Sequence, residues 1–448
     1  MSHVFRQYDI RGVAGPDLTE EFVAELGKSL ATFYRRNQVE TISLGYDCRL
    51  SSPVFRKILL ENLLNSGINV YDIGMGPTPL VYFSLFNLPV EGGVMITGSH
   101  NPPNENGFKI CLGHSTIYGE QIQEIKGIME AKDYQSGAGK LIEQSIITEY
   151  LKHLRSIIQP GAKKLKVVVD AGNGTGNITA VKLYQDLGWE VIDLFSEPDG
   201  NFPNHHPDPT LPENLIQLTA KVKESQADLG ISLDGDADRI GVVDAKGRVL
   251  WGDQLMILYA ADIVKRNPGA KIIGEVKCSQ TMFDRIQALG GTPIMWKVGH
   301  SLIKAKMKEE EALLAGEMSG HLFFADRYYG YDDAVYAGAR LLEILSHSHQ
   351  SLAEMVDGLP KTCSTPEIRF DCPEEKKFKV VEELVKSYAL KNQVIDIDGA
   401  RIIFNDGWGL ARASNTQPVL VLRFEADSET ALERIQGEVK NELKRLLL

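Results

Sequence analysis

Apolar and polar positions along the chain form a pattern that repeats three times. Each copy has an apolar strand, a helix, a second strand, a second helix and a third apolar strand that ends in a polar loop. The copies begin at residues 41, 166 and 271. Alternation of strands and helices predicts mixed or parallel sheets covered by helices, the α/β fold class. Because ligands gather at the carboxyl ends of such strands, we expect the three polar loops to converge on one cleft.

The pattern changes after residue 360. An extended segment at 367–371, a helix at 380–390 and a hairpin at 394–404 precede a polar loop, a strand and an amphipathic last helix. This order is typical of a smaller α+β domain. We therefore expect three related α/β modules with mixed sheets plus a smaller C-terminal α+β domain around a central cleft. The predicted domains are 1–145, 146–248, 249–360 and 361–448.

Length and composition narrow the class of protein. The chain has 448 residues, with 48 basic and 60 acidic side chains and a formal net charge of −12. An acidic balance disfavours nucleic acid as a partner. The N-terminus lacks the apolar region of a signal peptide, and the longest apolar run, 255–261, is far shorter than the roughly 20 residues of a membrane span. Five cysteines without a C-x-x-C pair argue against a disulfide framework. We expect a cytoplasmic protein with no membrane partner.

Three carboxylates follow the last strand of the second copy at alternate positions, namely Asp234, Asp236 and Asp238. Such a cluster repels itself unless a cation is present, and hard cations prefer carboxylate oxygens. The Gly and Glu positions of an EF-hand are occupied by Arg239 and Ala245, which excludes a calcium sensor of that type. The triad predicts a Mg²⁺ site, with Arg239 able to hold a phosphate oxygen. A solvated acidic turn is the alternative.

The first copy ends in the loop TGSHNP, which places Ser99 at a strand terminus. A serine hydrolase would need glycine where Thr97 and Asn101 stand, so that class is excluded. Mg²⁺ on the aspartate loop, together with Lys109, would lower the cost of negative charge on Ser99 Oγ or on an attached phosphoryl group. The alternative is a plain turn, because Ser, Asn, Gly and Pro are the usual turn formers.

Two further polar loops offer groups for a sugar phosphate. Glu317, Ser319 and His321 close the third copy, at the position equivalent to those of Ser99 and the aspartates, and can bind hydroxyls. Arg412 opens a loop of hydroxyl and amide donors that suits phosphate. A polar hairpin turn is the alternative for this last loop.

Taken together, TGSHNPPNENGFKI, DGDADRIG, GEMSGH and RASNTQP resemble, in order and separation, the motifs of the α-D-phosphohexomutase family. The opening FRQYDIRG and the stretch KVGHSLIKAKM extend the resemblance to essentially the whole chain, which is closest to the bacterial phosphomannomutase/phosphoglucomutase branch. The family has four domains around a central cleft, three of them related α/β modules. The resemblance implies an enzyme that interconverts the 1- and 6-phosphates of mannose and glucose through a phosphoserine and a 1,6-bisphosphate that reorients in the cleft.

The resemblance also implies roles for individual residues. Ser99 would be the phosphoserine, and Mg²⁺ would be bound by Asp234, Asp236, Asp238 and a phosphoserine oxygen. A hexose 1,6-bisphosphate would act as activator, and the chain would be a monomer or a weak homo-oligomer. Further catalytic residues would be His100, Lys109, Arg239 and His300. Residues that would contact the sugar phosphate are Tyr8, Arg11, Lys277, Glu317, Ser319, His321, Arg412, Ser414, Asn415 and Thr416.

Three other functions are compatible with these residues. A Mg²⁺-dependent phosphatase would use the same phosphoserine but transfer the phosphoryl group to water. A sugar-phosphate-binding regulator would have no turnover. A phosphoglucosamine mutase would differ little in its sugar loop, although Met318 in that loop favours hexoses without an amino group.

Overall fold

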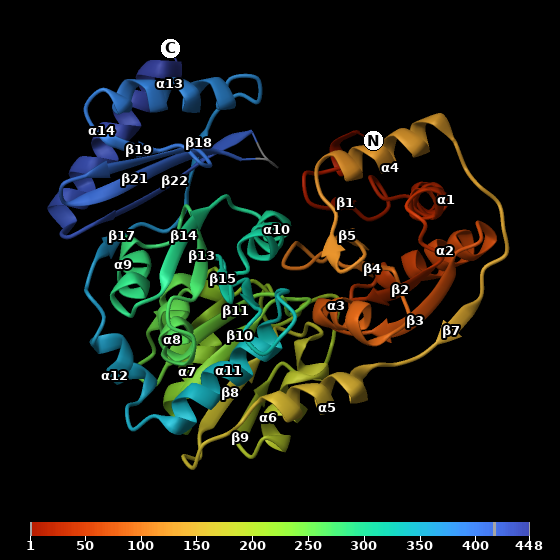
Figure 1. Cartoon of the computed structure of the whole chain (residues 1–448), viewed down its shortest axis with the longest axis horizontal. Helices are drawn as coiled ribbons and strands as arrows, with labels where there is room; N and C mark the ends of the chain where they lie inside the picture. Colours follow the sequence, from red (N-terminus) through yellow and green to blue (C-terminus); the bar gives the residue numbers. More distant parts are fainter. Residues whose placement is uncertain (1, 415–417, 448) are drawn as a thin grey trace.

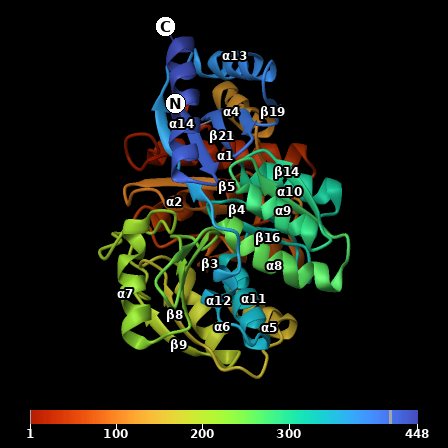
Figure 2. The ribbon, with the colours of Figure 1, turned by 90° about the vertical axis from the view of Figure 1, so that its left-hand side faces the viewer.

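The computed structural model describes residues 2–414 and 418–447. Its chain forms four modules, each built on its own sheet. The first module lies to one side, the second and third pack against each other, and the fourth lies above the third (Figure 1). The view turned by 90° shows the fourth module at one end and the second at the other (Figure 2). The predicted α/β class is confirmed, whereas the four predicted domain boundaries stay a prediction.

The first module is a mixed sheet covered by helices. Its elements are β1 (Ile10–Val13), α1 (Glu20–Arg36), β2 (Thr41–Tyr46), α2 (Ser52–Asn65), β3 (Asn69–Met75), α3 (Thr78–Asn87), β4 (Gly92–Ile96), β5 (Glu105–Leu112), β6 (Ser115–Thr116), α4 (Glu120–Ala131) and β7 (Leu141–Glu143). β2 is parallel to β3 and β4, and β5 is antiparallel to β4. Every residue of β4 is buried, so the chain leaves the sheet interior at its end and enters the loop that carries Ser99.

The second module repeats this plan with fewer strands, in the order β12-β11-β10-β8-β9. Its elements are α5 (Ile147–Ile157), β8 (Lys166–Asp170), α6 (Ala180–Asp186), β9 (Glu190–Leu194), α7 (Ile216–Ser225), β10 (Leu229–Leu233), β11 (Ile240–Asp244) and β12 (Val249–Leu250). β10 is parallel to β8 and antiparallel to β11. The acidic loop 234–239 is therefore the connection between two buried, hydrogen-bonded strands, which restricts its path.

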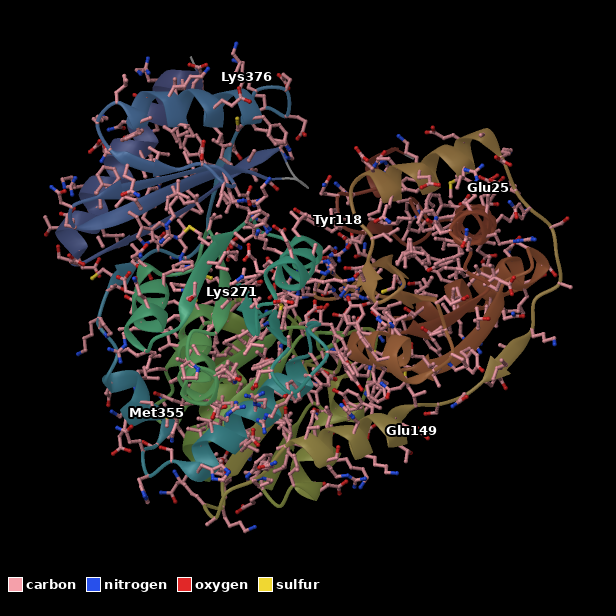
Figure 3. All side chains as sticks on the ribbon, viewed as in Figure 1. Glu25, Tyr118, Glu149, Lys271, Met355 and Lys376 are labelled. Atoms are coloured by element: carbon pink, nitrogen blue, oxygen red, sulfur yellow. The ribbon has the colours of Figure 1, made fainter. Side chains whose placement is uncertain are left out.

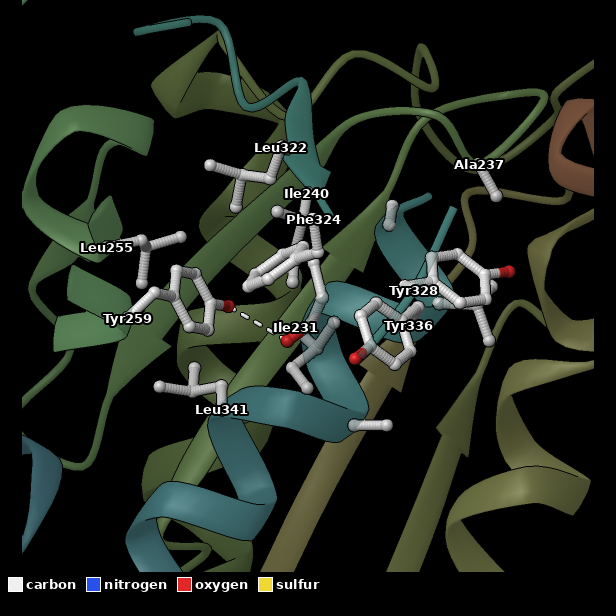
Figure 4. Packing of buried hydrophobic residues seen from close by; sticks show 14 of the residues in the cluster. Ile231, Ala237, Ile240, Leu255, Tyr259, Leu322, Phe324, Tyr328, Tyr336 and Leu341 are labelled. Carbon is white, nitrogen blue, oxygen red and sulfur yellow. Dashed lines mark hydrogen bonds between the residues drawn. The ribbon is translucent and has the colours of Figure 1, made fainter. Parts of the chain in front are cut away.

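The third module has the sheet order β14-β13-β15-β16. Its elements are α8 (Gly252–Arg266), β13 (Lys271–Glu275), α9 (Gln280–Ala288), β14 (Thr292–Trp296), α10 (His300–Glu310), β15 (Leu314–Gly316), β16 (Leu322–Phe324), α11 (Ala334–His347) and α12 (Leu352–Asp357). In α11 nearly every side chain is buried, because the helix packs in the core that the second and third modules share. Figure 4 shows this core, where the Tyr259 hydroxyl donates to the Ala337 carbonyl at 2.9 Å.

The fourth module is an antiparallel sheet with two helices on one face. Its elements are β17 (Cys363–Ser364), β18 (Ile368–Asp371), α13 (Lys377–Ala389), β19 (Gln393–Ile395), β20 (Ala400–Phe404), β21 (Gly407–Ala413), β22 (Val419–Ala426) and α14 (Glu429–Leu447). The predicted hairpin is present, with β19 antiparallel to β20. The module has a hydrophobic core of its own, separate from the core that spans the other modules.

Candidate active site

The loop after β4 meets the loop after β10, although the two belong to different modules. Ser99 is 2% exposed and has φ of 49°, in the left-handed region that non-glycine residues rarely adopt. Its Oγ donates a hydrogen bond to Asp234 Oδ2 at 2.9 Å and lies 3.1 Å from His100 Nδ1. The predicted meeting of the serine with the acidic loop is thus present in the fold.

The acidic loop is held by hydrogen bonds from both modules. Asp234 Oδ1 accepts from the backbone N–H groups of Asp238 and Arg239, both at 3.1 Å. From the first module, the Thr78 hydroxyl donates to Asp236 Oδ2 at 2.5 Å, and the Thr78 N–H donates to the Asp236 carbonyl at 2.8 Å. These contacts fix the direction of the carboxylates relative to Ser99.

The closeness of the two loops depends on a residue without a side chain. A Cβ built on Gly235 would lie 2.5 Å from the Ser99 carbonyl oxygen, which is closer than real Cβ atoms come. Only glycine lets the two backbones approach to this distance.

A buried lysine neutralises part of the acidic charge. Lys109 Nζ donates to Asp236 Oδ2 at 2.6 Å and also donates to Asp238. Burial acts to lower the Lys109 pKa, but the two carboxylates overcome it and raise the pKa, so the side chain is an ammonium. Burial, and then repulsion by Asp238 and Asp236, raises the pKa of Asp234 well above its usual value. The triad as a whole is therefore short of positive charge.

The donor set of the triad fits a hard divalent cation. Asp234, Asp236 and Asp238 are fully buried and offer one oxygen each, all within 4.8 Å of one another. Within the described part of the chain, buried Asp236 Oδ1 has no hydrogen-bond partner. A buried carboxylate oxygen without a partner is costly, and oxygen ligands alone are what Mg²⁺ prefers. These residues can hold such an ion.

The loop of the third module joins this cluster through a histidine. His321 Nε2 lies 3.2 Å from Asp238 Oδ1, and His321 Nδ1 lies 2.9 Å from Glu317 Oε2. Burial acts to lower the His321 pKa, but Asp238 and then Glu317 raise it to about 9. Burial acts to raise the pKa of Glu317, but His321 overcomes it and lowers the pKa to about 2. The loop thus presents an anionic acceptor beside a cationic imidazole. Ser319 of the same loop is half-buried.

Four more of the predicted residues lie at this junction. Arg239 Nε is 2.9 Å from His321 Nε2. His300 begins α10, with its ring 5.6 Å from the His321 ring and 6.2 Å from the ring of Tyr8. Burial lowers the pKa of His300 well below its usual value, so its imidazole is neutral near pH 7. Arg11 Nη1 donates to Asn101 Oδ1 in the Ser99 loop at 2.9 Å.

The predicted phosphate-binding residues have other partners. Arg412 pairs with Asp398 at 3.1 Å, and Asp398 accepts from the Val298 N–H at 2.9 Å. Lys277 pairs with Glu367 at 2.5 Å. Among the described residues, neither cation contacts the Ser99 cluster by a hydrogen bond or an ion pair. Ser414 is buried directly after β21, and Asn415 and Thr416 lie outside the described residues.

Sequence patterns did not identify three buried residues at this junction. Arg49 lies beneath the Ser99 loop, Thr78 binds the acidic loop, and Asp332 pairs with Lys304 at 3.0 Å near His300. Thr78 opens a helix before a proline and so resembles an ordinary helix start. Arg49 follows the end of β2, the kind of position that held the other candidates, which is the one signal that pointed to it.

Comparisons with known proteins cover nearly the whole chain. Four family models match it, described as phosphoglucomutase/phosphomannomutase alpha/beta/alpha domain I at residues 2–136, domain II at 148–247, domain III at 251–363 and the C-terminal domain at 367–442. These spans follow the order of the four sheets described above.

Curated and solved proteins agree with these models. The phosphomannomutase/phosphoglucomutase of Pseudomonas aeruginosa is 48% identical over 442 residues, which are 98% of this chain and 95% of that protein. The phosphoglucomutase of Neisseria gonorrhoeae is 46% identical over 98% of this chain and 96% of its own length. A crystal structure of a phosphoglucomutase/phosphomannomutase family protein from Burkholderia thailandensis has a TM-score of 0.95 and 42% identity, covering 100% of this chain and 98% of that one.

Proposed function

Because the chain belongs to the phosphoglucomutase/phosphomannomutase family, we propose that it interconverts hexose 1-phosphate and hexose 6-phosphate, with glucose and mannose as the sugars. The observation that carries this proposal is the 2.9 Å hydrogen bond from Ser99 Oγ to Asp234. It brings a hydroxyl that can carry a phosphoryl group to a carboxylate cluster that can hold a cation. No described helix has the length and apolarity needed to cross a bilayer.

Mg²⁺ is the cation we propose for the triad Asp234, Asp236 and Asp238. When bound, it would neutralise charge on a phosphoryl group carried by Ser99. A hexose 1,6-bisphosphate would serve as activator, because it can phosphorylate Ser99 when the serine is free. The triad, Lys109 and Arg239 form the electrostatic half of the site, and the loops of the third and fourth modules form the half that recognises the sugar phosphate.

The reaction has two phosphoryl transfers. In the first, the bond between phosphorus and Ser99 Oγ breaks as phosphorus bonds to the free hydroxyl oxygen of the sugar, and the hydroxyl proton passes to a base. The resulting 1,6-bisphosphate turns round in the site. In the second, its other phosphoryl group returns to Ser99 Oγ, and the sugar oxygen that is released takes up a proton. The sugar must turn because one serine cannot reach both of its ends.

His300 is the base that we favour over Lys109. The imidazole of His300 is neutral near pH 7 because burial lowers its pKa, so it can accept a proton. Lys109 is held as an ammonium by two aspartates and is a poor base. We propose that Lys109 stabilises negative charge on the phosphoryl group during transfer. His100 contacts the Ser99 hydroxyl.

The other predicted residues would bind the sugar phosphate. Glu317 and Ser319 accept or donate hydrogen bonds to sugar hydroxyls, in either orientation of the substrate. Arg412, with Ser414, Asn415 and Thr416, binds the phosphate that does not react. The remaining contacts are assigned to Tyr8, Arg11, Lys277 and His321.

A turnover assay tests the activity. We expect glucose 1-phosphate and mannose 1-phosphate, each with Mg²⁺ and a trace of the matching bisphosphate, to give the 6-phosphates without release of inorganic phosphate. Release of inorganic phosphate would instead identify a phosphatase. Ser99→Ala should lose nearly all turnover, and a variant that keeps it would contradict the phosphoserine mechanism. Glucosamine 1-phosphate in the same assay separates the phosphoglucosamine mutase alternative.

We propose the cytoplasm as the location and a monomer or a weak homo-oligomer as the state of the chain. The support for the cytoplasm is that the five cysteines are all free, as expected in a reducing compartment. Size-exclusion chromatography with light scattering tests the oligomeric state.

A further inference from the structure

A buried arginine lies directly beneath the Ser99 loop. Arg49 is fully buried just after β2, and its guanidinium donates to four backbone carbonyls of the loop. Nη2 donates to the carbonyls of Ser99 at 2.7 Å and Asn101 at 2.6 Å. Nη1 donates to those of Pro102 at 2.5 Å and Glu105 at 2.9 Å.

The fifth N–H group of the guanidinium is also used. Arg49 Nε donates to Asp47 Oδ2 at 3.2 Å, and the same carboxylate accepts from the Gly98 N–H at 3.2 Å and from the Ser52 hydroxyl at 2.6 Å. An arginine has five donors in a fixed planar fork, and here each one has an acceptor. A lysine has three donors at one nitrogen and cannot span the same set of carbonyls.

The conformation of the loop depends on this arrangement. Ser99 has a positive φ, and its carbonyl points down to Arg49 while its hydroxyl points to Asp234. A Cβ built on Gly98 would lie 2.5 Å from Arg49 Cζ, so the guanidinium fills the space beneath the loop. The hydrogen bonds to the carbonyls compensate for an unfavourable backbone conformation at the serine.

The second module covers the other side of the same guanidinium. The Phe202 ring lies 5.1 Å from Arg49 Cζ, and a Cβ built on Gly200 would lie 2.8 Å from Arg49 Cα. The arginine therefore sits at the junction of the two modules whose loops form the catalytic cluster, and a change at this position acts on both.

We propose that Arg49 is a positioning residue for phosphoryl transfer. It holds the Ser99 loop so that Oγ faces the acidic triad, and it places a permanent positive charge beneath the serine without touching the reacting atoms. The inference rests on the proposed function, since it concerns how that reaction is prepared. Misplacement of a reacting group by about 1 Å can cost about 10²-fold in rate.

The test is Arg49→Lys, which keeps the charge and removes the fork. We expect kcat for glucose 1-phosphate to fall about 10²-fold with KM nearly unchanged, because the sugar and phosphate contacts lie on other loops. Mass spectrometry after incubation with glucose 1,6-bisphosphate should show slower phosphorylation of Ser99. A merely structural role would lower the melting temperature without changing either property of the folded enzyme.

Arg56→Lys is the matched control. Arg56 belongs to the same module and pairs with Asp72, but it makes no contact with the Ser99 loop among the described residues. We expect its kcat to equal that of the wild type. If Arg49→Lys does not fold, Asp47→Asn replaces it. That variant weakens the contacts of Asp47 with Arg49 Nε and the Gly98 N–H but keeps the four bonds from Arg49 to the loop carbonyls, and we expect kcat to fall about tenfold.

The proposal is overturned if folded Arg49→Lys, or Asp47→Asn in its place, has the wild-type kcat and rate of phosphorylation. Failure of the proposed function gives a different result, because the wild type itself would then show no mutase turnover.

Discussion

Two junctions between modules differ in how they are built. At the junction of the first and second modules, side chains of one module bind side chains of the other, with Ser99 on Asp234, Thr78 on Asp236 and Lys109 on Asp236. At the junction of the third and fourth modules, Arg401 and Arg423 donate to backbone carbonyls of residues 276–278, and the ion pair of Lys277 with Glu367 adds a contact between side chains.

The hydrophobic cores also differ. One core extends through parts of the first three modules, and the first module has a second core of its own. The fourth module has a separate core and contacts the third through a small apolar cluster of Val276, Trp408 and Leu410, beside a cavity of about 230 Å³. Figure 3 shows side chains filling the region between the first module and the second and third, with Tyr118 at the edge that faces the fourth. The comparison teaches that Ser99 and the acidic triad lie where modules share a hydrophobic core, whereas the loop proposed to bind phosphate belongs to a module with a separate core.

The largest effect should come from the first junction. Asp236→Asn removes one charge from the triad and weakens the contact with Lys109. We expect kcat to fall on the order of 10³-fold, because the electrostatic stabilisation of the phosphoryl group is lost. Turnover assays measure the loss of kcat, and titration calorimetry measures the Mg²⁺ affinity. Asp193→Asn, which changes an exposed carboxylate, is the control. Asp236→Asn with wild-type turnover and Mg²⁺ affinity would contradict the assigned metal site.

A smaller effect is expected from Gly235→Ala. Its Cβ would meet the Ser99 carbonyl oxygen at 2.5 Å and push the two loops apart, so we expect kcat to fall about 10²-fold in a folded protein. The control is Gly127→Ala in α4, where a Cβ meets nothing within 4 Å and alanine should stabilise the helix slightly. Equal kcat in the two variants would mean that the close approach of the loops is unimportant.

A change at the junction of the third and fourth modules should alter KM more than kcat. Arg412→Gln removes the guanidinium proposed for the non-reacting phosphate, and we expect KM for glucose 1-phosphate to rise about 10- to 100-fold with a smaller change in kcat. Arg434→Gln, an exposed arginine of the same module that pairs with Asp406, should leave KM unchanged. A loss confined to kcat would assign Arg412 to the chemistry and remove the contrast between the junctions.

The smallest effect concerns the pH dependence of the shared core. Burial raises the pKa of Asp333 to about 6, and the Tyr150 and Tyr328 hydroxyls donate to its carboxyl group. The folded state therefore binds the proton more tightly than the unfolded state, so this group lowers the free energy of unfolding as pH rises from about 4 through 6.

Asp333→Asn keeps an acceptor for the Tyr336 N–H at the start of α11 but cannot ionise. Between pH 5 and pH 7.5, we expect the free energy of unfolding of the variant to rise relative to that of the wild type by about 1.5 kcal/mol. Urea unfolding at the two pH values gives the difference. A constant difference between the two proteins would show that Asp333 does not titrate in this range.

Periodicity predicted most of the elements that carry the site. The three predicted copies, which begin at residues 41, 166 and 271, have their counterparts in the modules that contain β2, β8 and β13, the strands that begin at those residues. α1 and α11 were not among the predicted elements, because they lie outside the three-fold pattern. α11 is buried on nearly all sides and has no clear polar face to reveal its period.

The site was predictable where its residues stand at strand ends. That position is shared by Ser99, the aspartates and Glu317, and their hydroxyl and carboxylate groups indicate the chemistry they can perform. Arg49 and Thr78 were not found because their importance comes from what they contact. Arg412 was found, but its ion pair with Asp398, a residue of its own module, was not.

The sequence alone determined the α/β modules, their order and the family, because these depend on local periodicity and on short motifs whose residue types are read directly. Only the tertiary structure decided that a guanidinium after β2 underlies the serine loop, that a missing Cβ at residue 235 lets two backbones touch, and that three modules share one core. Each of these depends on distances between segments remote in the chain, and the spacing of residues along a sequence does not contain such distances.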